Sequence, residues 1–86
     1  MHGGGFDKEA MNRTRVESSS VRSIGYDPVH RVLEIEFRPR RLYRYFDVPD
    51  DVYEGLVHAP SIGRFVNYNI KERFHYEEVE REEPQP

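Results

Sequence analysis

The residues with the most chemical potential lie in one short stretch near the middle of the chain. Four arginines and three aromatic residues fall within the nine positions from Arg38 to Phe46. Guanidinium groups bind phosphate in a bidentate manner, and exposed aromatic rings stack on nucleic-acid bases. The stretch therefore indicates a contact surface for nucleic acid or for nucleotide phosphate. The candidate phosphate contacts are Arg38, Arg40, Arg41, Arg44, Arg64, Lys71 and Arg73, and the candidate stacking residues are Tyr43 and Tyr45.

Catalytic chemistry has little support in the sequence. The chain has no cysteine, which excludes disulfides, thiolate chemistry and cysteine-based zinc sites. The four histidines are scattered without metal-ligand spacing. The sequence contains no nucleophile–base pair, glycine-rich phosphate loop or carboxylate pair of catalytic type. We therefore predict a non-catalytic protein with no metal site and no cofactor.

Ser61 and Gly63 allow two interpretations. They could begin a helix whose free amides and dipole bind an anion. They also fit an N-cap serine, which satisfies a backbone amide, followed by a glycine that permits close packing. We favour the second, structural interpretation.

Length and charge limit the kind of binding that is possible. Eighty-six residues are enough for one small domain. Residues 77–86 hold five glutamates and one arginine, whereas residues 16–76 hold nine basic and nine acidic side chains. A balanced domain is not a general polyanion binder, so we expect a local basic patch at 38–44. The acidic end could compete with phosphate for the same arginines.

The hydropathy pattern predicts three strands. Residues 21–26 alternate between apolar and polar with one break at Ser23. In the segment 31–37, Leu33, Ile35 and Phe37 share one face and Glu34 and Glu36 the other. Between them, Asp27-Pro28 favours a turn. Pro39 cannot donate to a strand ladder, which places a second reversal at 38–41. Residues 42–47 then return as the third strand.

Two helices follow the strands. Pro49 suits a first helical turn, and the acidic residues after it complement the helix dipole. Pro60 ends this helix, and Ser61 begins the next, whose apolar stripe includes Ile62 and Phe65. The prediction is an α+β domain, a three-stranded antiparallel β-meander followed by two helices packed on one face (β-β-β-α-α), over residues 16–76. Residues 1–15 are predicted to be a flexible N-terminal tail, and residues 77–86 an acidic disordered one.

The register of the second hairpin decides which way the tyrosines point. If Phe37 lies opposite Leu42, then Tyr43 and Tyr45 share the exposed face with Glu34 and Glu36. A loop one residue shorter places the tyrosines beside the apolar residues of the preceding strand, in the core. Glu34 and Glu36 would then face Arg44 on the exposed side, as ion pairs that contribute little stability. We favour the register with buried tyrosines.

These elements resemble a known family. Tyr43-Arg44-Tyr45 is similar to the central Tyr-x-Tyr of the KTSC domain, a module found at the C-terminus of some lysyl-tRNA synthetases and as a stand-alone bacterial protein. The further matches, over residues 18–76, are Tyr26-Asp27-Pro28, Leu33, Phe37, Val48-Pro49, Ala59, Ser61, Gly63, Asn67 and Ile70. The chain departs from the family at Pro39-Arg40, where a Ser-Gly pair is common, and at Glu72, where a glycine is expected. The second departure suggests a second helix that runs on toward Phe74.

The resemblance implies a function no more specific than binding. The family's function is unknown, RNA binding is suggested for it, and no catalytic residues accompany it. The first hypothesis is a module that binds RNA or tRNA through the arginine-rich hairpin. The alternative is a module for protein–protein interaction or self-association, through an exposed strand edge. No apolar run approaches the ~20 residues of a membrane span and the amino terminus lacks a signal peptide, so we expect a soluble cytoplasmic protein that does not contact a membrane.

Overall fold

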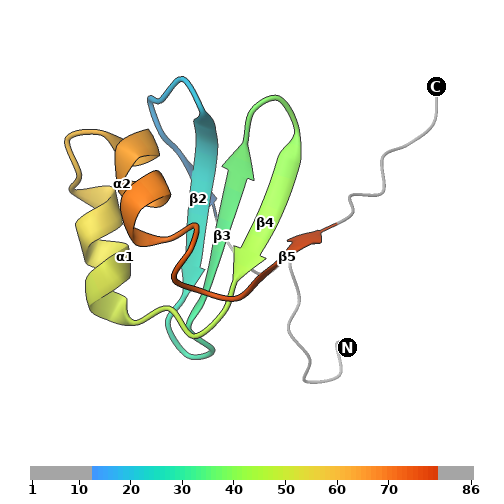
Figure 1. Cartoon of the computed structure of the whole chain (residues 1–86), viewed down its shortest axis with the longest axis vertical. Helices are drawn as coiled ribbons and strands as arrows, with labels where there is room; N and C mark the ends of the chain where they lie inside the picture. The colour runs from blue at the N-terminus through green and yellow to red at the C-terminus, as the bar shows by residue number, and fades with distance from the viewer. Residues whose placement is uncertain (1–12, 80–86) are drawn as a thin grey trace.

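The structure, a computed structural model, describes residues 13–79. They form one five-stranded antiparallel sheet, with its strands in chain order, and two helices (Figure 1). The strands are β1 (Arg13–Arg15), β2 (Val21–Asp27), β3 (Val32–Phe37), β4 (Arg41–Tyr45) and β5 (Tyr76–Val79), and the helices are α1 (Asp50–Val57) and α2 (Ile62–Asn69). No helix among these residues is long and apolar enough to cross a membrane.

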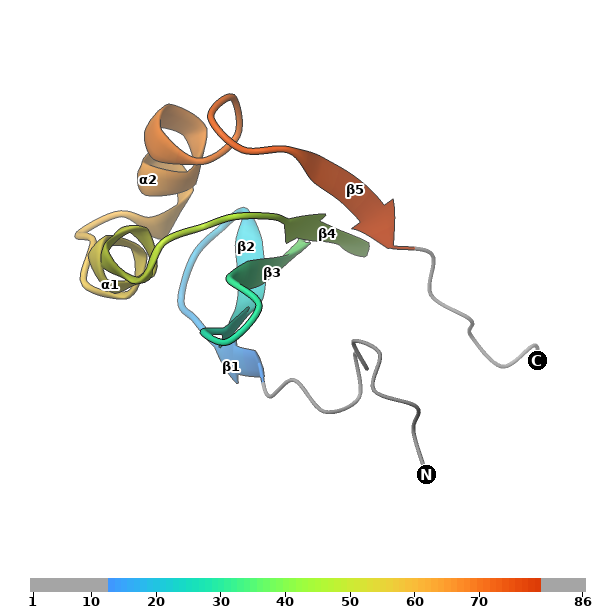
Figure 2. The ribbon, with the colours of Figure 1, turned by 90° about the horizontal axis from the view of Figure 1, so that it is seen from below.

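The predicted three-stranded meander is present as β2, β3 and β4, but three strands understate the sheet. β1 and residues 77–79 of β5 come from the segments predicted to be tails, and the two strands pair with β2 and β4 at opposite edges of the sheet (Figure 2). Both strands are rich in charge, which suggested solvated tails. Their charges instead meet partners across the sheet, where Arg13 contacts Glu34 and Glu78 contacts Arg41. The other residues of the predicted tails, 1–12 and 80–86, lie outside the described residues.

A β-bulge explains the break in the pattern of the first predicted strand. Val21 pairs with Phe37, but the next pair joins Ser23 to Glu36, so Arg22 is an extra residue in β2. A bulge reverses the alternation of side chains at that point. As a result, Val21 and Ile24 both face the helices and are buried.

The predicted turn between β2 and β3 is confirmed, and Asp27 stabilises it. The Oδ1 atom of Asp27 accepts hydrogen bonds from the amides of Val29 and His30. Its Oδ2 atom lies 2.7 Å from Nδ1 of His30. The hydrogen bond with the His30 ring is the main reason why the pKa of Asp27 is lower than its usual value.

The register with buried tyrosines is confirmed. Leu33 pairs with Tyr45 and Ile35 with Tyr43, so both tyrosines project toward the helices, whereas Arg44 lies opposite Glu34 on the other face. The shorter connection of 38–40 selects this register, because one residue fewer in a hairpin loop exchanges the two faces of a strand.

The core lies between the sheet and the helices. Its fully buried members from the sheet include Leu33, Ile35 and Tyr45, and they pack with Leu56 of α1 and Val66 of α2. Pro49, predicted to lie in the first turn of this helix, is instead the N-cap of α1, and Asp50 and Asp51 fill the first turn as predicted.

The prediction that the second helix runs toward Phe74 is wrong. α2 ends at Asn69, and the amides of Ile70 and Lys71 both donate to the carbonyl of Val66. Ile70 is fully buried, and Phe74 still packs against the core from the loop that follows. The helix must end here because the chain crosses to the far edge of the sheet to form β5 (Figure 2).

Tyr26 joins the sheet to the start of α1. Its ring stacks on that of Tyr53, with a centroid distance of 4.5 Å, and its hydroxyl is within hydrogen-bond distance of the Val48 carbonyl and the Asp50 carboxylate. Burial, and then the hydrogen bond with Asp50, raises the pKa of Tyr26 to about 12. The hydroxyl therefore remains protonated and able to donate at neutral pH.

We expect Tyr26→Phe to lower the free energy of unfolding by about 1 kcal/mol, because the ring stack remains and one hydrogen bond is lost. Urea unfolding followed by circular dichroism would measure this change. The matched control is Tyr68→Phe, since Tyr68 is 73% exposed on α2, and its effect should stay within about 0.5 kcal/mol. Equal losses in the two variants would contradict a specific role for the Tyr26 hydroxyl.

Candidate nucleic-acid interface

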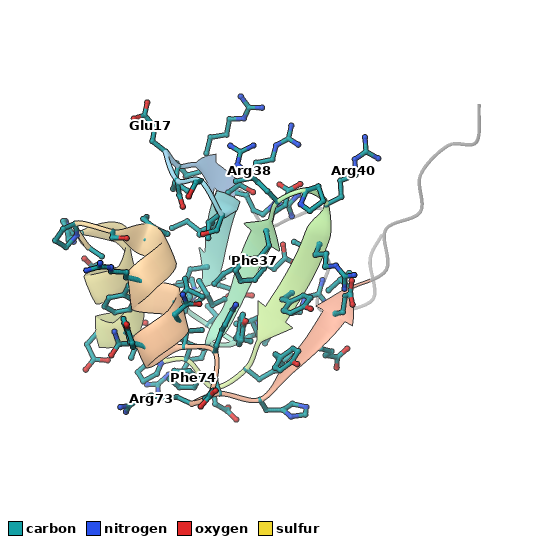
Figure 3. All side chains as sticks on the ribbon, turned by 45° about the horizontal axis from the view of Figure 1, so that its top comes forward. Glu17, Phe37, Arg38, Arg40, Arg73 and Phe74 are labelled. Carbon is teal, nitrogen blue, oxygen red and sulfur yellow. The ribbon has the colours of Figure 1, made fainter. Side chains whose placement is uncertain are left out.

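Two of the candidate arginines lie at the connection between β3 and β4. Arg38 and Arg40 occupy the same end of the sheet, and Arg40 extends outward from it (Figure 3). Arg38 also binds the connection between β1 and β2, since its amide donates to the carbonyl of Ser20 at 2.9 Å and its Nε to that of Ser18 at 3.3 Å. Both side chains are exposed.

Arg44 has a different role, because its guanidinium is directed at a buried carboxylate. Glu34 is fully buried, and its Oε2 accepts hydrogen bonds from Nη2 and Nε of Arg44, at 2.9 and 3.2 Å. Arg13 from β1 donates to its Oε1 at 2.8 Å. Two arginines thus hold one buried carboxylate, which places Arg44 among the side chains that maintain the fold.

The expectation that Glu34 and Glu36 are exposed is wrong. Glu36 is only 7% exposed, and its carboxylate accepts a hydrogen bond of 2.8 Å from the hydroxyl of Ser23. A buried carboxylate must have partners, because desolvation otherwise costs several kcal/mol. The alternation of residues in the strand did not reveal these partners, since Arg13 and Ser23 come from other strands.

On the helix side of the sheet, four rings form an aromatic cluster, consisting of Phe37, Tyr43, Tyr45 and Tyr76. Tyr43 stacks almost parallel to Tyr76, with centroids 5.1 Å apart and an angle of 13°, and meets Phe37 edge-on at 5.4 Å. Tyr45 is fully buried at the base, whereas Tyr76 is 47% exposed. Tyr43 and Phe37 are partly buried between them.

Tyr45 therefore cannot stack on a base, while Tyr43, Phe37 and Tyr76 approach the surface. Tyr76 is not among the predicted site residues, because the sequence pattern indicates no strand after the helices. The sequence contains one weak indication of a strand here. Phe74 and Tyr76 are two residues apart, as on one face of a strand, just before an acidic run.

Two cations flank the aromatic cluster. The Nζ atom of Lys71 lies 5.4 Å from the centroid of the Phe37 ring. Arg41 shares the helix side of β4 with Tyr43, and its Nη1 lies 3.5 Å from Oε1 of Glu78. The side chains of Arg41 and Glu78 are 62% and 47% exposed. Exposed ion pairs are weak, so Arg41 can exchange this carboxylate for another anion.

The remaining candidates are not brought to the aromatic cluster. Arg73 lies beside Phe74, at the end of the sheet away from Arg38 and Arg40 (Figure 3). Arg64 is exposed in the first turn of α2. Among the described residues, no group of three or more His, Cys, Asp or Glu side chains could hold a metal ion.

The start of α2 supports the structural interpretation of Ser61 and Gly63. The hydroxyl of Ser61 accepts a hydrogen bond from the amide of Arg64 at 3.3 Å. A Cβ atom on Gly63 would lie 2.8 Å from Oγ of Ser20, so a glycine lets the helix approach the connection between β1 and β2. Capping and close packing account for both residues.

Several known proteins are similar to this chain in sequence or in structure. The family model of the KTSC domain matches residues 17–74. An uncharacterized protein of Stutzerimonas stutzeri is 47% identical over 66 residues, which cover 77% of this chain and 92% of that protein. The crystal structure of a KTSC domain protein from Yersinia pestis superposes with a TM-score of 0.80 at 42% identity, covering 83% of this chain and all of that one.

A longer protein shares the same segment. A lysine–tRNA ligase of Nostoc sp. is 38% identical over 63 residues, which cover 73% of this chain but 11% of the ligase. The similarity thus concerns one small part of that enzyme.

We expect Arg44→Ala to destabilise the fold by about 2–4 kcal/mol, because Glu34 would keep its burial and lose one of its two cations. Arg40→Ala, at an exposed position in the connection between β3 and β4, is the matched control and should change stability by less than about 0.5 kcal/mol. Thermal or urea unfolding would measure both. A loss below about 1 kcal/mol in Arg44→Ala would show that Arg13 alone satisfies the carboxylate.

The buried Tyr45 predicts a loss of stability at alkaline pH. Burial raises the pKa of Tyr45 from 10.0 to about 12. Because the unfolded chain ionises first, the stabilisation is complete below about pH 10 and is lost between pH 10 and 12. Between pH 8 and 11, Tyr45 should account for about 1.4 kcal/mol of the loss. Urea unfolding at both pH values should show a smaller loss in Tyr45→Phe, and an equal loss would contradict the assignment.

Proposed function

Because this chain belongs to the KTSC domain family, we propose that it is a small, non-catalytic module that binds RNA through the helix side of β4 and the adjoining hairpin connection. The observation that carries the proposal is the placement of Tyr43 and Arg41 on one face of β4, with Phe37 and Lys71 beside them. Rings next to exposed cations are the combination that single-stranded nucleic acids require, since rings stack on bases and cations contact phosphates.

The similarity to part of a lysine–tRNA ligase supports RNA as the ligand. That protein joins lysine to tRNA, as its name states, and the segment similar to this chain is a part of it. A KTSC module that contacts RNA would serve such an enzyme as an additional binding surface.

The charge of the domain sets the strength of binding. Residues 16–76 are electrically balanced, so the affinity depends on a few local cations rather than on the net charge. The proposed contacts are Arg38, Arg40, Arg41 and Lys71, which are all exposed. Each phosphate contact to a single strand contributes about 0.7 to the slope of log K against log salt, so the full slope should be near −3.

We expect the purified protein to bind a fluorescently labelled single-stranded RNA of about 12 nucleotides, with the affinity falling as salt rises. The double variant Arg40→Ala/Arg41→Ala should reduce the magnitude of the salt slope by about 1.4, because two phosphate contacts are removed. Fluorescence anisotropy at several salt concentrations measures both quantities.

Arg73→Ala is the matched control, because Arg73 is an exposed arginine at the other end of the sheet (Figure 3). It should leave the affinity and the slope unchanged. A wild-type protein that binds no RNA at low salt would overturn the proposal. An equal loss in Arg73→Ala would show that the attraction is general and does not involve this surface.

A second candidate function is strand addition from a protein partner or from another copy of the chain. β5 is an edge strand that pairs with β4 on one side, and open edges accept a further strand through backbone hydrogen bonds. Sedimentation of the protein alone would reveal self-association, and this outcome together with an absence of RNA binding would favour the second candidate.

A further inference from the structure

Two side chains of β5 contact residues of β4 that are proposed to bind RNA. Tyr76 offers a flat aromatic ring, as a base does, and Glu78 offers an anion, as a phosphate does. The ring of Tyr76 lies on that of Tyr43, nearly parallel at 13° and with centroids 5.1 Å apart. The carboxylate of Glu78 faces the guanidinium of Arg41 at 3.5 Å. A flat aromatic ring on Tyr43 and an anion on Arg41 are the two contacts expected from the base and the phosphate of a bound nucleotide.

The two contacts have the same geometry within the sheet. In the ladder, Glu78 lies directly opposite Tyr43 and Tyr76 opposite Tyr45. The ring and the carboxylate both extend to the diagonal neighbour nearer the start of β4, and the Tyr76 ring also contacts Tyr45, with centroids 5.5 Å apart and an angle of 42°. Residues two apart on a strand lie about 6.8 Å apart on the same face, so β5 presents its ring and anion at the same spacing as the ring and cation of β4.

Both contacts can be broken at little cost. The ion pair is exposed on both sides, and Tyr76 is almost half exposed. β5 has four residues, and at the edge of the sheet it has one neighbouring strand. Short edge elements with few buried contacts are the parts of a fold that open most readily. The side chains of Tyr76 and Glu78 can therefore move away while the core around Tyr45 stays intact.

We infer that Tyr76 and Glu78 occupy, in the free protein, the places of a base and a phosphate, so that β5 competes with the ligand. This inference rests on the proposed RNA-binding function and specifies its ligand and its regulation. A base can stack on this side of Tyr43 after the Tyr76 ring has left it. The ligand must be unpaired, because bases inside a double helix do not offer their faces for stacking.

The test uses the full chain, a labelled single-stranded RNA and two single substitutions. Glu78→Gln removes the competing anion, and Tyr76→Ala removes the competing ring. We expect Glu78→Gln to bind about threefold to fivefold more tightly, as expected for loss of an exposed ion pair. Tyr76→Ala should bind at least about fivefold more tightly, as expected when a stacked ring is vacated.

Glu54→Gln is the control for the change in net charge, because Glu54 is an exposed residue of α1. It should leave the affinity unchanged. A labelled RNA duplex of the same length should bind all the proteins more weakly than the single strand does. A circular dichroism spectrum identical to that of the wild type would confirm that each variant is folded.

The possible outcomes separate this inference from the proposed function. If the wild type binds RNA and Tyr76→Ala weakens the binding, Tyr76 belongs to the stacking surface, and the competition is overturned while the proposed function stands. If Glu78→Gln and Glu54→Gln strengthen binding equally, the effect is one of net charge and the inference is likewise overturned. If no protein binds RNA at low salt, both the inference and the proposed function fail.

Discussion

The carboxylate of Glu34 is the point on which the arrangement of the sheet depends. It is fully buried and is held by Arg13 of β1 and Arg44 of β4, so it joins three strands of the sheet through one ion-paired group. A slip of β4 by one residue would move Arg44 to the other face and leave the carboxylate short of a partner. The cost of an uncompensated buried charge, several kcal/mol, therefore selects one register. That register sends Tyr45 into the core and leaves Arg41 and Tyr43 at its margin.

Some residues of β4 therefore stabilise the fold, whereas others are exposed and available to a ligand. Arg44 and Leu42 face the side of the sheet with the buried glutamates, and Tyr45 closes the core against the helices. Arg41 lies near the hairpin connection with its side chain mostly in solvent. The arginines of this stretch are thus not equivalent, although they are neighbours in the sequence. The role of each arginine depends on which face of the sheet its side chain occupies and on how close the residue is to the end of the strand.

The sequence was sufficient for those parts of the fold that depend on neighbours in the chain. The strand predicted over 31–37, the turn at Asp27 and the N-cap Ser61 follow from local patterns, and the structure contains each of them. Burial of Glu34 and the presence of β1 and β5 depend on pairing between segments that are distant in the sequence. Charged residues at these positions are indistinguishable from those of a solvated segment until their partners are known. The stack of Tyr76 on Tyr43 was inaccessible for the same reason, because it requires β5 to lie beside β4.

The charges on the two edge strands affect how separate copies of the molecule can pair with one another. β1 carries Arg13 and Arg15, whereas β5 carries Glu77 and Glu78. Open strand edges are templates on which further chains can add, and charged side chains are a common protection against such growth. Two copies that met through the same edge would bring arginines against arginines or glutamates against glutamates. Like charges therefore oppose pairing through identical edges, and the pairing of β1 with β5 is the arrangement in which the edge charges of two copies are complementary.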